Sequence, residues 1–125
     1  MTDIFLPVVS TLSSYRFLAH DERRLYEGLS HALTEVGFAF ERERVLVYPD
    51  RRVGRLDYYL PATRLAIEVK VRGQHAAVIR QITRYANHHE VAAVLLVTTM
   101  ARLAHAPESL AGKPVQCLRI TGAFG

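Results

Sequence analysis

The feature that most constrains the fold of this chain is the run VAAVLLVTT at residues 91–99, which contains no charged side chain. A strand that is apolar at every position needs cover on both faces, and such strands occur mainly in parallel sheets between layers of helices. A chain of 125 residues, half of them hydrophobic, is long enough to bury a core of that kind without disulfides or metals. The run therefore predicts an α/β domain with a central sheet.

The rest of the sequence predicts the order of elements around this strand. Apolar spacing and turn residues indicate helices over residues 20–36 and 74–89, strands over 38–48, 54–60, 65–71, 91–99 and 114–120, turns at PDRR and PATR, and a short helix near 107–111. His20 and Asp21 are expected to cap the first helix, and Gly37 to end it. The order αβββαβ predicts one three-layer domain over residues 1–125, with a mixed sheet and a core at about 20–99.

Composition and charge narrow the possible function classes. The single cysteine, Cys117, excludes an internal disulfide and fits a cytoplasmic protein, and no apolar run approaches the length needed to span a membrane. Residues 41–84 carry a net charge of +5 whereas the remainder carries −1, in a chain with a pI near 9.6. This uneven charge indicates either a polyanionic partner or a solvated, arginine-rich face.

Three charged side chains interrupt the apolar strands in the middle of the chain. In the run LAIEVKV at residues 65–71, alternation places Glu68 and Lys70 on one face, and Asp57 lies at the centre of the preceding strand. A tight turn makes these strands antiparallel neighbours, so the two carboxylates are expected to lie side by side. Buried carboxylates that repel each other need a cation between them. Hard oxygen ligands at the edge of a sheet favour Mg²⁺, which also keeps several waters.

Lysine is rare in this chain, which has fourteen arginines and two lysines. A partly buried lysine can lose its proton whereas an arginine cannot, so Lys70 beside two carboxylates indicates a residue that orients or deprotonates an attacking water. The alternative is a simple ion pair between Glu68 and Lys70 on a solvated face of the sheet. The apolar residues that flank Asp57, Glu68 and Lys70 favour phosphodiester hydrolysis over that alternative.

The letters LD, a gap of ten residues and the letters EVK, with a helix before and a helix after, resemble the core motif of the PD-(D/E)xK nuclease superfamily. The likeness covers most of the chain and departs from the family name at Leu56, which stands where the name has proline. The resemblance implies a restriction-endonuclease-like fold in which Asp57 and Glu68 bind Mg²⁺, or Mn²⁺ in its place, with help from the Val69 carbonyl. It also implies that Lys70 positions the water.

The resemblance implies two further residues, one on each helix of the core. Members resembling Holliday junction resolvases carry a glutamate on the first helix, for which Glu22 and Glu27 are candidates. Glu22 lies on the apolar stripe, three residues before Leu25, whereas Glu27 lies two residues after Leu25 and is expected to turn toward the far side. Glu22 is therefore preferred, although an acid in a first turn also complements the helix dipole. On the second helix, Gln81 is either the polar residue that such enzymes use or a surface glutamine.

Several basic side chains fit contacts to a phosphate backbone, which position a nucleic acid without reading its bases. They lie in the hairpin beside Asp57, after the Glu68 strand and along one side of the second helix: Arg51, Arg52, Arg55, Arg72, Arg80 and Arg84, with His88 continuing the helical group. DNA is therefore the expected partner.

Together these features predict a Mg²⁺-dependent endodeoxyribonuclease that selects DNA by shape, as Holliday junction resolvases do. Paired cuts in a junction require a symmetric homodimer. Within enzymes, the alternative is a restriction-like or exonucleolytic phage or repair nuclease. From another class, the alternative is a non-cleaving DNA-binding or assembly subunit with the same fold, although such a subunit does not need a buried pair of acids.

Overall fold

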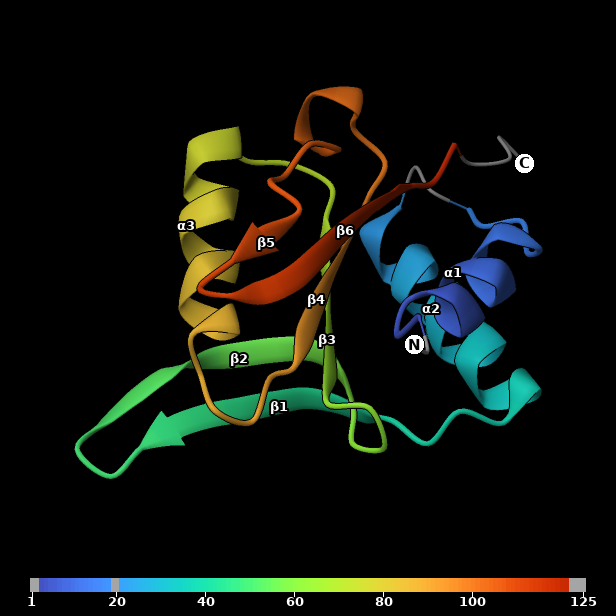
Figure 1. Ribbon diagram of the computed structural model, residues 1–125. Coiled ribbons are helices and arrows are strands. Elements are labelled where there is room, and N and C mark those ends of the chain that lie inside the picture. The colour runs from blue at the N-terminus through green and yellow to red at the C-terminus, as the bar shows by residue number, and fades with distance from the viewer. Residues whose placement is uncertain (1–2, 19–20, 122–125) are drawn as a thin grey trace.

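The apolar run at residues 91–99 supplies an inner strand of a six-stranded mixed sheet, which lies between two layers of helices (Figure 1). The computed structural model describes residues 3–18 and 21–121. Its elements are α1 (Leu6–Ser13), α2 (Glu22–Val36), β1 (Glu41–Tyr48), β2 (Arg51–Leu60), β3 (Leu65–Lys70), α3 (His75–Ala86), β4 (Ala93–Thr98), a 3-10 turn (Ala101–Leu103), β5 (Ser109–Leu110) and β6 (Lys113–Arg119). This architecture confirms the predicted α/β class and mixed central sheet.

The strands follow the order β1-β2-β3-β4-β6-β5 across the sheet. The pairs β1–β2, β2–β3 and β5–β6 are antiparallel, whereas β3, β4 and β6 run parallel to one another. Every residue of β4 is buried, as its sequence predicts. The chain passes from β3 through α3 to β4, which is the helical crossover that neighbouring parallel strands require.

Helices α1 and α2 cover one face of the sheet, and α3 covers the other (Figure 1). On β3, Ile67 packs in the core under α1 and α2, and Ala66 packs in the core under α3. Alternation therefore directs Glu68 and Lys70 to the side of Ala66, away from Ile67. The long β1–β2 hairpin extends beyond both helical layers (Figure 1).

Helix α2 begins and ends as its sequence predicts. Asp21 Oδ1 accepts hydrogen bonds from the N–H groups of Arg23 and Arg24, at 3.0 and 3.5 Å, and Gly37 ends the helix with φ = +98°. His20, the other half of the predicted cap, lies outside the described residues. Among the described helices, none is long and apolar enough to cross a membrane.

Two local predictions about loops are wrong. The segment predicted as a short helix near 107–111 instead leads into β5, and the turn to β6 consists of Ala111 and Gly112, with φ of +52° and +75°. Two consecutive residues with positive φ form a hairpin turn, and alanine hides this because it rarely adopts that conformation. The predicted turn PDRR is shorter than expected, since Arg51 already pairs with Tyr48 in the β1–β2 ladder.

His88 does not extend the basic side of α3, contrary to the sequence prediction. The helix ends at Ala86, and the His88 ring is fully buried beneath the hairpin. Its Nδ1 accepts the Glu90 N–H at 3.1 Å, and its Nε2 donates to the Val47 carbonyl at 2.8 Å. His88 thus fastens the hairpin to the end of α3.

Candidate functional site

Strands β2 and β3 separate where the predicted acids lie. Their pairing runs from Leu60 and Leu65 to Tyr58 and Ile67. Beyond that point the Asp57 N–H donates to Glu68 Oε1 at 2.9 Å. The N–H of Val69 donates to Asp57 Oδ2 at 2.7 Å. These two hydrogen bonds replace the backbone ladder and hold both carboxylates in the gap between the strands.

A change of face in the hairpin creates this gap. Residues two apart in a strand normally share a face. Leu56, however, packs in the core under α3, whereas Tyr58 packs in the core under α1 and α2. In β1 the residue opposite Asp57 is Glu43, which has φ = +55°. In both strands of the hairpin, the alternation of side chains between the two cores is therefore interrupted at the level of Asp57 and Glu43. As a result, Asp57 points into neither core.

Burial and mutual repulsion dominate the electrostatics of the acidic pair. Burial raises the pKa of Glu68 well above its ordinary value, and the charge of Asp57 raises it further. Burial also raises the pKa of Asp57, against the opposing effects of the Val69 N–H and of the Lys70 charge. Only 1% of Glu68 is exposed, so its charge has almost no help from solvent. The pair therefore disfavours two negative charges unless a cation joins it.

Lys70 is close enough to be part of this group. It is the last residue of β3, and its charge lowers the pKa of both Asp57 and Glu68. The Lys70 carbonyl accepts a hydrogen bond from the Thr98 hydroxyl, which fixes the end of β3 against β4. The structure thus brings together the three residues on which the sequence prediction depends.

The donor set fits a hard divalent cation. Two carboxylates in one confined place are the ligands that Mg²⁺ prefers, and a cation relieves the repulsion that raises the pKa of Glu68. Within the part of the chain that the structure describes, no three His, Cys, Asp or Glu side chains gather around one point. Glu22 is therefore not grouped with the acidic pair, and the predicted carbonyl of Val69 and waters would complete the coordination.

An open cleft of about 690 Å³ adjoins Asp57. Residues of α2, β1 and β2 line it: Glu22, Arg23, Tyr26, Glu27, Ser30, Arg42, Glu43, Arg55 and Asp57. Both candidate glutamates face this cleft, although the helical phase predicted that Glu27 turns away. Glu27 pairs with Arg23 at 2.8 Å, whereas Glu22 pairs with Arg72 at 3.2 Å. Glu22 is thus linked to Arg72 in the loop after β3, and Glu27 to its own helix.

Sequence reasoning missed Tyr26, which lines the cleft together with Glu22 and Asp57. Burial raises its pKa, and the charges of Asp57 and Glu22 raise it further. The Tyr26 carbonyl accepts the Tyr58 hydroxyl at 2.9 Å, which ties α2 to β2. Its place four residues after Glu22, on the same helical face, was the available indication.

Gln81 contacts Tyr85 on the α3 side of the sheet. Gln81 Nε2 donates to the Tyr85 hydroxyl at 3.1 Å, and that hydroxyl donates to the Arg55 carbonyl at 3.3 Å. The charge of Glu68 helps to raise the pKa of Tyr85. Gly54 makes room for the ring, since a Cβ at this position would lie 2.6 Å from Tyr85 Cε1. Gln81 is therefore placed to position Tyr85.

The six predicted DNA-binding arginines divide into separate groups. Arg55 lines the cleft beside Asp57. Arg72 lies at the edge of the cleft, where it pairs with Glu22. Three others line a smaller hollow of about 150 Å³ at the far end of the hairpin: Arg51, Arg52 and Arg84. Arg80 is exposed on α3, one turn before Arg84. The structure thus places only Arg55 and Arg72 near the acids.

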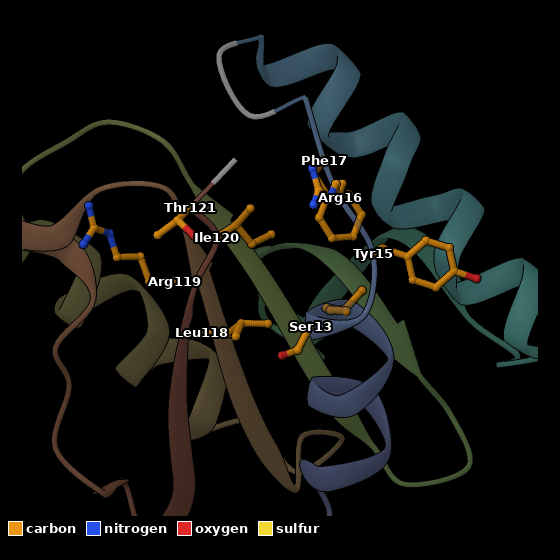
Figure 2. Close-up of a pocket in the computed structure, with 9 residues that line it drawn as sticks. Ser13, Tyr15, Arg16, Phe17, Leu118, Arg119, Ile120 and Thr121 are labelled. Atoms are coloured by element: carbon orange, nitrogen blue, oxygen red, sulfur yellow. The ribbon is translucent and has the colours of Figure 1, made fainter. Parts of the chain in front are cut away.

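A separate cavity of about 480 Å³ lies between the segment after α1 and the end of β6 (Figure 2). Apolar residues such as Leu118 and Ile120 face Phe17 across it, with Arg16 and Arg119 at its margins. None of the predicted site residues lines it. The predicted site residues therefore adjoin the cleft beside Asp57 and not this cavity.

Comparisons of this chain with protein-family models, with curated proteins and with solved structures find no match.

Proposed function

We propose that this protein is a Mg²⁺-dependent endodeoxyribonuclease whose metal-binding residues are Asp57 and Glu68. The observation that carries this proposal is the pair of carboxylates fixed by backbone N–H groups in the gap between β2 and β3, with the charge of Lys70 acting on both. A pair of buried acids held in this way destabilises the fold, and its retention favours a catalytic use over a structural one.

Each residue has a defined task in the proposed reaction. When bound, Mg²⁺ supplies polarisation of the phosphodiester and a more acidic water. Asp57 and Glu68 hold their oxygens in place through the Val69 and Asp57 N–H groups. Lys70 orients the attacking water or accepts its proton. Tyr26 shares the cleft with Asp57, and Gln81 holds Tyr85 on the other side of the sheet.

DNA is the proposed substrate because the segment that carries the acids, residues 41–84, has a net charge of +5. Arg55 and Arg72 lie near the acids, and the hollow at the hairpin end carries further arginines. Selection of DNA by shape, as in Holliday junction resolution, fits a small domain whose contacts go to phosphates. Paired cuts require the proposed symmetric homodimer. The lone cysteine, Cys117, fits the proposed action in the cytoplasm.

A second candidate function has an observation in its favour. Because no third acid, histidine or cysteine joins the pair among the described residues, the same fold could serve as a non-cleaving DNA-binding or assembly subunit. Such a subunit would bind DNA through its arginines and would have no need of a divalent cation. Metal dependence therefore separates the two functions.

The deciding experiment is a cleavage assay with a titration of MgCl₂. Supercoiled plasmid, linear duplex and a four-way junction are incubated with the protein, and parallel reactions contain EDTA or MnCl₂. We expect cleavage that rises with Mg²⁺, with Mn²⁺ as a substitute, and paired nicks in the junction. Binding of DNA without cleavage at any metal concentration would favour the subunit, and a lack of DNA binding would exclude both.

The two glutamates of the cleft give a matched test on one helix. Glu22→Gln is expected to slow cleavage by about tenfold to a hundredfold, the usual effect of losing a group that supports metal ligands. Glu27→Gln removes the same charge from the same cleft, yet it breaks only the pair with Arg23 and should leave the rate nearly unchanged. Single-turnover rates measure both. A slow Glu27 variant with a normal Glu22 variant would identify Glu27 as the helical acid.

A further inference from the structure

Arg42 is fixed on the wall of the cleft by two aromatic rings and two hydrogen bonds. Its Cζ lies 4.9 Å from the centre of the Tyr26 ring and 4.6 Å from that of Tyr58. Its Nε donates to the Asp57 carbonyl at 3.2 Å, and a terminal nitrogen donates to the Ser30 hydroxyl at 3.4 Å. Residues of α2 and β2 therefore hold one guanidinium from β1 in a defined place, beside a predicted metal ligand.

The backbone is distorted in a way that delivers Arg42 to this place. Arg44, two residues later, lies on the opposite face of the hairpin over the Tyr59 ring and pairs with Glu90. The intervening Glu43 has φ = +55°, a conformation that is unfavourable for a residue with a side chain. Strain of this kind clusters at functional sites, and here it directs one arginine of the pair into the cleft.

The guanidinium retains donors for a ligand. An arginine has five N–H donors, of which the Asp57 carbonyl and the Ser30 hydroxyl engage two. Among the described residues, no carboxylate lies within ion-pair distance of Arg42, whereas Arg23 and Arg72 are paired with Glu27 and Glu22. Arg42 is exposed and lines the cleft together with Asp57. It therefore offers an uncompensated positive charge with a fixed orientation.

We propose that Arg42 binds a non-reacting backbone phosphate of the DNA that enters the cleft. This inference rests on the proposed nuclease function and adds a residue that the motif does not contain. The planar guanidinium of Arg42 is already immobilised, so it loses little conformational freedom when it binds a ligand. It therefore positions a phosphate better than a mobile surface arginine does. The Nε of Arg42 donates to the Asp57 carbonyl. A DNA phosphate bound to Arg42 is therefore held at a fixed position relative to Asp57, the proposed metal ligand.

The salt dependence of DNA binding tests this contact directly. The logarithm of the binding constant falls with the logarithm of the salt concentration by about 0.9 for each phosphate contact with duplex DNA. Binding of a fluorescein-labelled duplex is measured by anisotropy in EDTA, which prevents metal-dependent cleavage. We expect Arg42→Gln and Arg42→Met to weaken binding by about tenfold or more at low salt. Both variants should also lower the slope by about 0.9. Methionine retains the apolar contact with the rings.

Arg23→Gln is the matched control, because Arg23 also lines the cleft but is neutralised by Glu27. It should leave the slope unchanged. The inference fails if the folded Arg42 variants keep the original slope, or if Arg23→Gln lowers it equally. Loss of fold in both Arg42 variants, seen in melting curves, would assign Arg42 to packing of β1 on α2 and also overturn the proposal. If the unsubstituted protein binds no DNA, the proposed function itself fails.

Discussion

Lys70→Arg is expected to leave the protein nearly as inactive in DNA cleavage as Lys70→Ala. Both variants should lose about a hundredfold to ten-thousandfold in rate, which is the usual contribution of a general acid or base. Arginine keeps the positive charge next to Asp57 and Glu68, but it does not release its proton under working conditions. Its planar fork also places the donors elsewhere than the single ammonium group of lysine.

The position of Lys70 makes this substitution informative. Its backbone is fixed by the hydrogen bond from Thr98 to its carbonyl, so the two side chains start from the same point. Single-turnover nicking rates measure the effect, and DNA affinity in EDTA should persist in both variants. Arg119→Lys, on the exposed side of β6, is the reciprocal control and should cleave normally. Cleavage near the original rate by Lys70→Arg would reduce Lys70 to a counter-ion for the carboxylates.

The layered fold could be predicted because burial and sequence pattern agree in its main elements. β4 has no charged side chain and is buried on both faces, and β3 alternates between two cores as its pattern predicts. Asp21 and Gly37 mark the ends of α2. α1 was not predicted because its eight residues are apolar on more than one side and show no clear helical period.

The shape of the candidate site could be predicted only in part. The spacing of Asp57 and Glu68 indicates neighbouring strands, but alternation alone does not reveal the gap that the two carboxylates occupy. That gap depends on the positive φ of Glu43, and no glycine marks the position in the sequence. Tyr26 and Arg42 reach the cleft from other elements, so only the tertiary arrangement brings them to Asp57.

Glu68→Gln is expected to abolish cleavage and, in the same molecule, to stabilise the metal-free protein at neutral pH. The amide keeps an oxygen for the Asp57 N–H and directs its NH₂ toward the Asp57 carboxylate, so it removes the repulsion without removing the packing. It is, however, a poor ligand for Mg²⁺, and the reaction loses one of its two acids. Asp57→Asn should likewise stop cleavage. DNA binding in EDTA should persist or improve in both variants, because a negative charge near phosphate is lost.

The pH dependence gives the sign of the stability effect. The folded-state pKa of Glu68 is raised above its ordinary value of 4.5, so the folded protein holds this proton more tightly than the unfolded chain does. The free energy of unfolding therefore falls as the pH rises from about 4.5 through the raised pKa, and is constant above it. Glu68→Gln removes this fall and should increase the free energy of unfolding at neutral pH.

Thermal melts in EDTA across this pH range measure the difference, with Glu27→Gln as the exposed control. Added Mg²⁺ should stabilise the original protein, because a ligand of the folded state shifts the unfolding equilibrium, and it should do little for Glu68→Gln. A variant that melts lower at neutral pH would show that the Glu68 carboxylate supports the fold rather than burdening it. A variant that still cleaves DNA at the full rate would remove Glu68 from the proposed metal site. The opposite effects on stability and activity are thus what distinguish a catalytic acid pair from a structural one.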